Sequence, residues 1–180
     1  SWNHVNLATP TSNSPFSTAS FAATNHLISL GHKDIAFISG SHSSAVSSDR
    51  ETGYRQAMQE HKLTTKEDWI SDGKLTIEDG RRITRRIVNQ NTYPTAILCA
   101  NDEMALGAIH EIKNAGLKVP EDISVVGFDN IRYAEISDPP LTTIAQPGEE
   151  IGEQTMYKLC KIIEGKPVNL APVIIPHQLI

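Results

Sequence analysis

One short apolar segment, Ile-Ser-Val-Val-Gly-Phe over residues 123–128, constrains the fold more than any other part of the chain. A run that stays apolar instead of alternating with polar residues is typical of a parallel β-strand covered by helices on both faces. The carboxylate of Asp129 follows the run directly. Because ligands of open α/β sheets bind at the carboxyl ends of the strands, the segment predicts an α/β fold and a candidate ligand contact at Asp129.

Helix-like and strand-like segments alternate along the rest of the chain, which predicts a parallel sheet with crossover helices in the order αβαβαβαβ, then a tail. We expect helices at Ala19–Leu30, Ser48–His61, Thr76–Val88, Asp102–Ala115, Tyr133–Ile136 and, after Pro147, up to Gly165. We expect strands at Ile35–Ile38, Trp69–Ile70, Ala96–Ala100, Ile123–Phe128 and Val173–Ile175. Ser48 has capping-box spacing to Glu51, so Arg50 is expected in the first turn of its helix.

Composition narrows the class of protein. The 180 residues are 39% hydrophobic and 21% charged, which is ordinary for one soluble domain. A net charge of -5 indicates that the chain by itself does not hold DNA. Cys99 and Cys160 are interpreted as small core residues of a cytoplasmic protein. No apolar run reaches the length of a membrane span, and residues 1–4 lack the pattern of a signal peptide.

Signals for catalysis, metals and cofactors are weak. The Gly-Ser-His-Ser-Ser stretch at residues 40–44 is not a nucleophile elbow, and no phosphate-binding loop is present in the sequence. The seven histidines show no spacing of metal ligands. We therefore expect a protein that is not an enzyme and that uses neither a metal nor a cofactor.

Polar groups follow successive strand ends and are expected to meet at one edge of the sheet. They are Arg50, the pair Asn101 and Asp102, and Asp129, with the apolar Leu75 after the second strand. A guanidinium, an amide and a carboxylate can together bind neighbouring hydroxyls, which favours a neutral polyol. The alternatives are structural. Arg50 could pair with Glu51 or Asp49 in solvent, Asp129-Asn130 could be a turn or a helix cap, and Asn101-Asp102 could cap a helix. We assign capping to Asp102, and ligand contact to Asn101 and Asp129.

Four motifs in order resemble the LacI/GalR family of bacterial transcription regulators. They are residues 30–36 (Leu-Gly-His-Lys-Asp-Ile-Ala), residues 100–108, residues 118–130 (ending Val-Val-Gly-Phe-Asp-Asn) and residues 138–146 (Asp-Pro-Pro-Leu-Thr-Thr-Ile-Ala-Gln). The resemblance implies a type I periplasmic-binding-protein-like lobe with helices on both faces of a parallel sheet. It assigns residues 14–146 and 170–180 to the C-terminal effector-binding lobe, 147–169 to a crossover helix of the N-terminal lobe, and 1–13 to an irregular remnant of that lobe. The family's helix-turn-helix DNA-binding domain has no counterpart here.

The resemblance also implies roles for individual residues. Arg50, three residues before Gly53-Tyr54, matches the family's ligand-binding arginine, and Asn101 and Asp129 match the amide and acid that contact effector hydroxyls. Leu75 stands where the family often has a stacking aromatic residue, and Val46 and Gln146 line the same region. A homodimer interface is implied for Thr76, Gly80, Leu106, Ile109, His110, Lys113, Tyr133 and Ile136.

The expected partners follow from the family. They are a small-molecule effector, operator DNA bound through the headpiece, and a second copy of the chain. Residues 116–122, 138–147 and 150–152 look most like repressors that respond to a nucleoside such as cytidine, and purine and sugar effectors remain open. The rival interpretation is a periplasmic sugar-binding protein of an ABC transporter, which shares the fold. A helix-turn-helix upstream would favour the repressor, and a signal peptide would favour the receptor.

Overall fold

A six-stranded sheet forms the centre of the molecule, in the order β2-β1-β3-β4-β5-β6. The computed structural model describes residues 14–41, 43–169 and 176–180. Neighbouring strands are parallel from β2 through β5, and β6 pairs with β5 in the antiparallel sense. The strands are β1 (Ile35–Ser39), β2 (Ile70–Asp72), β3 (Ala96–Cys99), β4 (Ser124–Asp129), β5 (Thr142–Ala145) and β6 (Gln178–Leu179).

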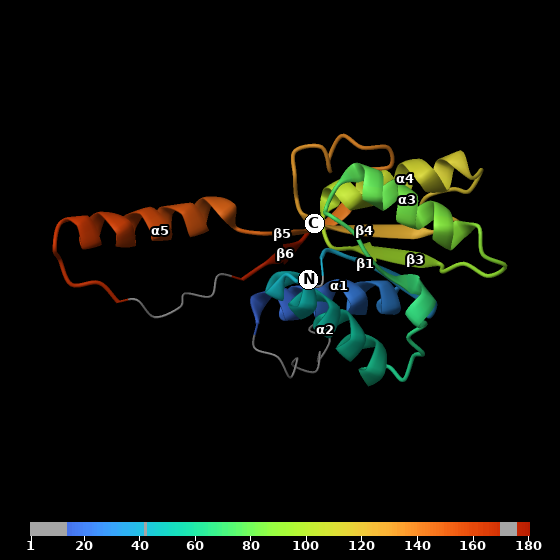
Figure 1. The fold of residues 1–180 in the computed structure, drawn as a ribbon, viewed down its shortest axis with the longest axis horizontal. Helices are drawn as coiled ribbons and strands as arrows, with labels where there is room; N and C mark the ends of the chain where they lie inside the picture. Colours follow the sequence, from blue (N-terminus) through green and yellow to red (C-terminus); the bar gives the residue numbers. More distant parts are fainter. Residues whose placement is uncertain (1–13, 42, 170–175) are drawn as a thin grey trace, which may run out of the picture.

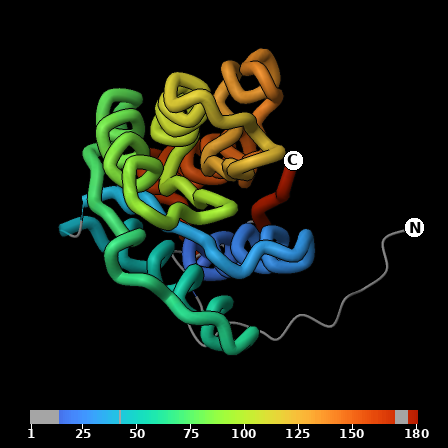
Figure 2. The backbone as a smooth tube through the Cα atoms, turned by 90° about the vertical axis from the view of Figure 1, so that its right-hand side faces the viewer, coloured from blue at the N-terminus to red at the C-terminus, as the bar shows by residue number. Residues whose placement is uncertain are grey.

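Two pairs of helices cover the sheet, one pair on each face (Figures 1 and 2). Helices α1 (Pro15–Ser29) and α2 (Ala45–Glu60) pack on one face, and α3 (Ile77–Val88) and α4 (Asp102–Asn114) pack on the other. Strand residues alternate between the two cores: Phe37 packs with the first helix pair and Ile38 with the second. The sheet is therefore buried on both faces, and the predicted parallel sheet with helices on both faces is confirmed.

Glycines allow α3 and α4 to approach closely. A Cβ atom added at Gly80 would lie 2.3 Å from the carbonyl oxygen of Met104, and one added at Gly107 would lie 2.3 Å from that of Ile77. Any larger residue at either position would push the helices apart. Gly80 is thus buried between α3 and α4.

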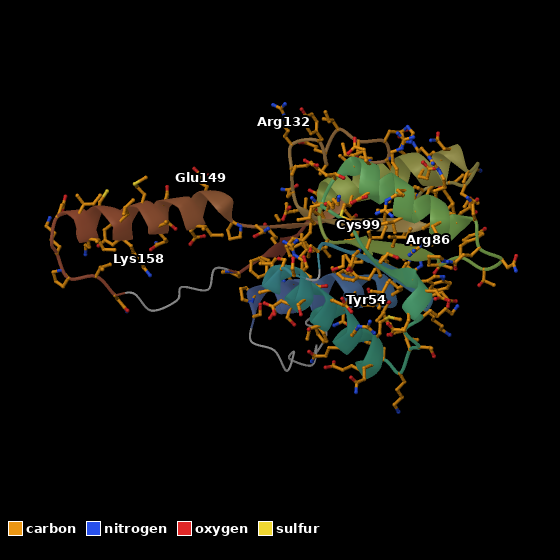
Figure 3. The ribbon with its side chains drawn as sticks, viewed as in Figure 1. Tyr54, Arg86, Cys99, Arg132, Glu149 and Lys158 are labelled. Atoms are coloured by element: carbon orange, nitrogen blue, oxygen red, sulfur yellow. The ribbon has the colours of Figure 1, made fainter. Side chains whose placement is uncertain are left out.

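Helix α5 (Gly148–Ile163) extends away from the sheet (Figure 1). It begins after Pro147 with Glu149 and Glu150 in its first turn, as the sequence predicts. None of its residues is buried, and its labelled side chains Glu149 and Lys158 stand clear of the α/β body (Figure 3). No helix in the described ranges is both long and apolar enough to cross a membrane.

Several predicted boundaries are wrong. Helix α2 begins at Ala45, so Ser48 is inside it: the Ser48 N–H already donates to the Ser44 carbonyl at 3.1 Å. Arg50 consequently lies in the second turn of α2 and not in the first. Trp69 belongs to a 3-10 turn, η1 (Glu67–Trp69), that precedes β2.

The region after β4 also differs from the prediction. Residues 133–136 form turns instead of a helix, and β5 and β6 are strands that the alternation of patterns did not indicate. Strand β5 is short, and only Thr143 and Ile144 within it are buried, so it lacks the apolar run of the central strands. The strand expected at Val173–Ile175 and the irregular segment expected at 1–13 lie outside the described residues.

Candidate functional site

The guanidinium of Arg50 is the centre of the candidate site, at the carboxyl edge of the sheet. The residue is 5% exposed, and its Nη1 donates to the Ala100 carbonyl at 2.5 Å. The group lies 3.9 Å above the centre of the Phe128 ring and 5.5 Å from that of Phe16. Its Nε has no hydrogen-bond partner among the described residues. Arg50 is therefore a buried cation whose Nε–H is unpaired among the described residues.

Asp129 faces this arginine from the end of β4. Its Oδ1 lies 3.5 Å from Arg50 Nη2 and accepts a hydrogen bond from Gln146 Nε2. Asp129 has φ +106 and the next residue, Asn130, has φ +54, which are uncommon conformations for residues other than glycine. Strained backbone of this kind clusters at functional sites. The sequence prediction that the strand ends converge thus brings together Arg50, Asp129 and Gln146.

The charges of Arg50 and Asp129 balance each other. Burial lowers the pKa of the Arg50 guanidinium, and the Asp129 carboxylate opposes that shift. Burial raises the pKa of the Asp129 carboxyl, against the effects of Arg50 and of the Gln146 hydrogen bond. Each group thus favours the charged form of the other, and the pair has no net charge.

Asn101 has a structural task in addition to its place at the edge. Its backbone is extended, and its Oδ1 accepts a hydrogen bond from the Met104 N–H at 3.0 Å, so Asn101 caps α4. The assignment of the cap to Asp102 is therefore wrong, because Asp102 is already the first residue of the helix. The Asn101 Nδ2 donates to the Leu75 carbonyl at 3.0 Å.

Leu75 and Val46 supply the apolar part of the edge. Leu75 has φ +62 and is half-exposed, and a Cβ atom at Gly40 would lie 3.0 Å from its Cδ2. Its side chain thus packs over the end of β1. Val46 is half-buried in the first turn of α2, one helical turn before Arg50 and on the same side of the helix.

The sequence did not predict that the Asp102 side chain is buried and hydrogen-bonded. Its side chain is 0% exposed and accepts hydrogen bonds from Thr143 Oγ1 at 2.6 Å and from the Ile131 N–H at 2.8 Å. Burial raises the pKa of the Asp102 carboxyl, and these hydrogen bonds oppose the shift. A run of Asn and Asp before a helix signals a cap, and nothing in that signal distinguishes a cap from a buried carboxylate.

The residues expected at a dimer interface divide into two groups. Gly80 and Ile109 are buried within the chain, the first against α4 and the second in the core. The remaining candidates are partly or fully exposed, and they are Thr76, Leu106, His110, Lys113, Tyr133 and Ile136. Lys113 is bound to Asp138 through its Nζ, 2.8 Å from Oδ2.

Comparisons with known proteins agree with this geometry. A family model described as a periplasmic binding protein-like domain matches residues 24–180. The transcriptional repressor PurR of Histophilus somni is 47% identical over 146 residues, which cover 81% of this chain and 44% of the repressor. The transcriptional repressor CytR of Escherichia coli is 40% identical over 163 residues, covering 91% of this chain and 48% of the repressor.

A solved structure shows the same fold. The lac repressor dimer bound to operator and the anti-inducer ONPF superposes with a TM-score of 0.84 at 32% identity, over 92% of this chain and 57% of that one. The chain spans about half the length of the curated relatives it matches. It therefore belongs to the periplasmic binding protein-like domain family, in the form found in regulators of the LacI/GalR family.

Proposed function

We propose that this chain is the effector-binding and dimerisation core of a LacI-type transcriptional repressor, and that its effector is a neutral polyol such as the nucleoside cytidine. The observation that carries the proposal is the ion pair between the buried Arg50 and the half-buried Asp129 at the carboxyl edge of a parallel sheet. Edges of this kind are where ligands of open α/β sheets bind.

The chemistry of the pair favours an uncharged ligand with several hydroxyls. A charged ligand would upset the balance between Arg50 and Asp129 in a partly dry site. A hydroxyl can accept from the guanidinium and donate to the carboxylate, so a vicinal diol fits both groups at once. Leu75 and Val46 add an apolar surface that a base or sugar ring can cover, and Asn101 keeps one amide N–H for the ligand.

The rest of the protein's activity is proposed by analogy. The lac repressor structure contains a dimer, operator DNA and a ligand. For this chain we propose the same partners in the cytoplasm, with DNA bound through a helix-turn-helix domain outside residues 1–180. We propose the dimer interface at the exposed candidates, Thr76, Leu106, His110, Lys113, Tyr133 and Ile136.

Helix α5 supports a two-lobed protein. Its apolar side chains include Ile151, Met156, Leu159 and Ile163, all exposed. Exposed apolar surface of this extent on one helix is typical of a face that another domain covers. We propose that residues 147–169 pack on an N-terminal lobe, while 14–146 and 170–180 form the C-terminal lobe.

Two other classes of protein are less favoured. The relatives named above are described as transcriptional repressors, which supports a regulator that is not an enzyme. The same names count against a periplasmic sugar receptor of an ABC transporter.

Calorimetric titration of the intact protein tests the proposal. Cytidine is the first ligand, followed by other nucleosides, purine bases and sugars. Arg50→Ala and Asp129→Ala should each abolish the response to the effector and leave operator affinity intact. Arg55→Ala is the matched control, because Arg55 lies on the same helix, half-exposed, and pairs with Glu51 and Glu67. Normal titration curves for both site variants would refute the site.

A further inference from the structure

A buried hydrogen-bond network joins the start of α4, strand β5 and the turn that carries Asp129. Thr143 Oγ1 donates to Asp102 Oδ1 at 2.6 Å and accepts from the Asn130 N–H at 3.4 Å. The other oxygen of Asp102 accepts from the Ile131 N–H at 2.8 Å. Both Asp102 and Thr143 are 0% exposed. The two residues that follow Asp129 are thus both held by side chains from other elements.

The turn needs such support, because it departs from relaxed backbone geometry. Asp129 and Asn130 both have positive φ, and neither is a glycine. Conformations of this kind persist only when the surrounding structure determines them. The hydrogen bonds to the N–H groups of Asn130 and Ile131 supply that constraint at the second strained residue and at the residue that follows it.

The network also explains a glycine in β4. A Cβ atom at Gly127 would lie 2.1 Å from Asp102 Oδ1. The Asp102 carboxylate therefore occupies the space that a side chain at position 127 would need, and it lies directly against the strand that ends in Asp129.

We propose that Asp102 and Thr143 are positioning residues of the effector site. They hold the turn at residues 129–131 so that the Asp129 carboxylate faces Arg50 and Gln146, and neither residue needs to contact the effector. The expected loss of effector affinity rests on the proposed function. The expected loosening of the turn at residues 129–131 rests on the hydrogen-bond network alone.

A purely structural role for the network predicts a different result. Removing the Thr143 hydroxyl would then lower the stability of the protein while the folded molecules bound effector normally. Positioning predicts instead that affinity falls in protein that is fully folded, and that a hydroxyl restored on a smaller side chain rescues it.

The decisive variant is Thr143→Val in the intact protein, titrated with cytidine and compared with Thr143→Ser. Thr143→Val keeps the volume but removes the hydroxyl, so we expect affinity for cytidine to fall about tenfold or more, the equivalent of one hydrogen bond. Thr143→Ser should bind within about threefold of wild type, because the two hydrogen bonds remain possible. Thr84→Val is the matched control: Thr84 is equally buried, in α3, and its hydroxyl has no partner among the described residues.

Amide hydrogen exchange separates failure of this inference from failure of the proposed function. In Thr143→Val, exchange at Asn130 should accelerate about tenfold with Ile38 in β1 unchanged, whether or not cytidine is a ligand. If wild type binds no nucleoside, that local acceleration still supports positioning and only the effector assignment falls. Unchanged exchange at Asn130 would overturn the inference. If wild type binds cytidine, equal affinity in Thr143→Val would also overturn it.

A second variant covers the case in which Thr143→Val does not fold. Asp102→Asn keeps the size of the side chain and can still accept from the Ile131 N–H, but it loses the charge that strengthens both hydrogen bonds. We expect weaker cytidine binding and faster exchange at Ile131. Wild-type values for both measurements would count against positioning.

Discussion

The strain at Asp129 can be measured by replacing the residue with glycine and with alanine. Both variants lose the carboxylate and its contacts with Arg50 and Gln146, so the difference between them isolates the backbone. At φ +106 the alanine variant keeps a conformation that costs roughly 1–3 kcal/mol for residues other than glycine. Glycine removes that cost, and its greater freedom in the unfolded chain takes back about 0.4–1 kcal/mol.

We therefore expect Asp129→Gly to be more stable than Asp129→Ala by about 1 kcal/mol, from the difference between these two effects. Urea unfolding at neutral pH, followed by circular dichroism, gives both free energies of unfolding. Neither variant should respond to cytidine, because both lack the carboxylate. Equal stabilities, or a more stable alanine variant, would mean that the positive φ stores no energy at this position and would refute the argument from strain.

Three further outcomes follow from the site. Gly127→Ala should lower the free energy of unfolding by about 1–3 kcal/mol, since its Cβ would meet Asp102 Oδ1, whereas Gly148→Ala, with nothing within 4 Å, should not; thermal unfolding compares them. Asn101→Ala should cost about 1 kcal/mol through loss of the α4 cap, and an unchanged melting temperature would contradict the capping role. Burial raises the pKa of Asp102, so the folded chain binds a proton on this carboxylate at a higher pH than the unfolded chain does. The stability of wild type relative to Asp102→Asn should therefore rise as pH falls from about 7 towards about 4, and urea unfolding across that range would detect a flat or opposite trend.

The central fold was predictable because burial on both faces leaves a plain signal in the sequence. Ile123–Phe128 and Ala96–Ala100 are apolar runs between two helix layers. Strand β3 lies within the second run, and β4 covers all but the first residue of the first run and continues to Asp129. Strand β5 gives no such signal, because only two of its residues are buried and one of these is Thr143. Its place is determined by pairing with β4, a contact distant in sequence that no local pattern records.

Much of the candidate site was predictable for a topological reason. Strand ends of a parallel sheet meet at one edge. Arg50 and Asp129 could therefore be expected to lie close together, although they are 79 positions apart in the sequence. The orientation of side chains within one turn was not predictable in the same way. The helix boundary at Ala45 moved Arg50 by one turn, and the helix pattern alone does not fix such a boundary.

The exchanged roles of Asn101 and Asp102 show what decides between neighbouring polar residues. Asn101 has the extended backbone of a cap, so its side-chain Oδ1 can accept a hydrogen bond from the Met104 N–H. Asp102, one residue later, has helical backbone and points into the sheet, where only a group that accepts on both oxygens can satisfy Thr143 and Ile131 together. An amide at position 102 would present one donor to that space, and a carboxylate at 101 would have no donor for the Leu75 carbonyl. The order Asn-Asp therefore matches the hydrogen-bonding demands of the two loops that border the site, which is why we expect an exchange of the two residues to disturb both.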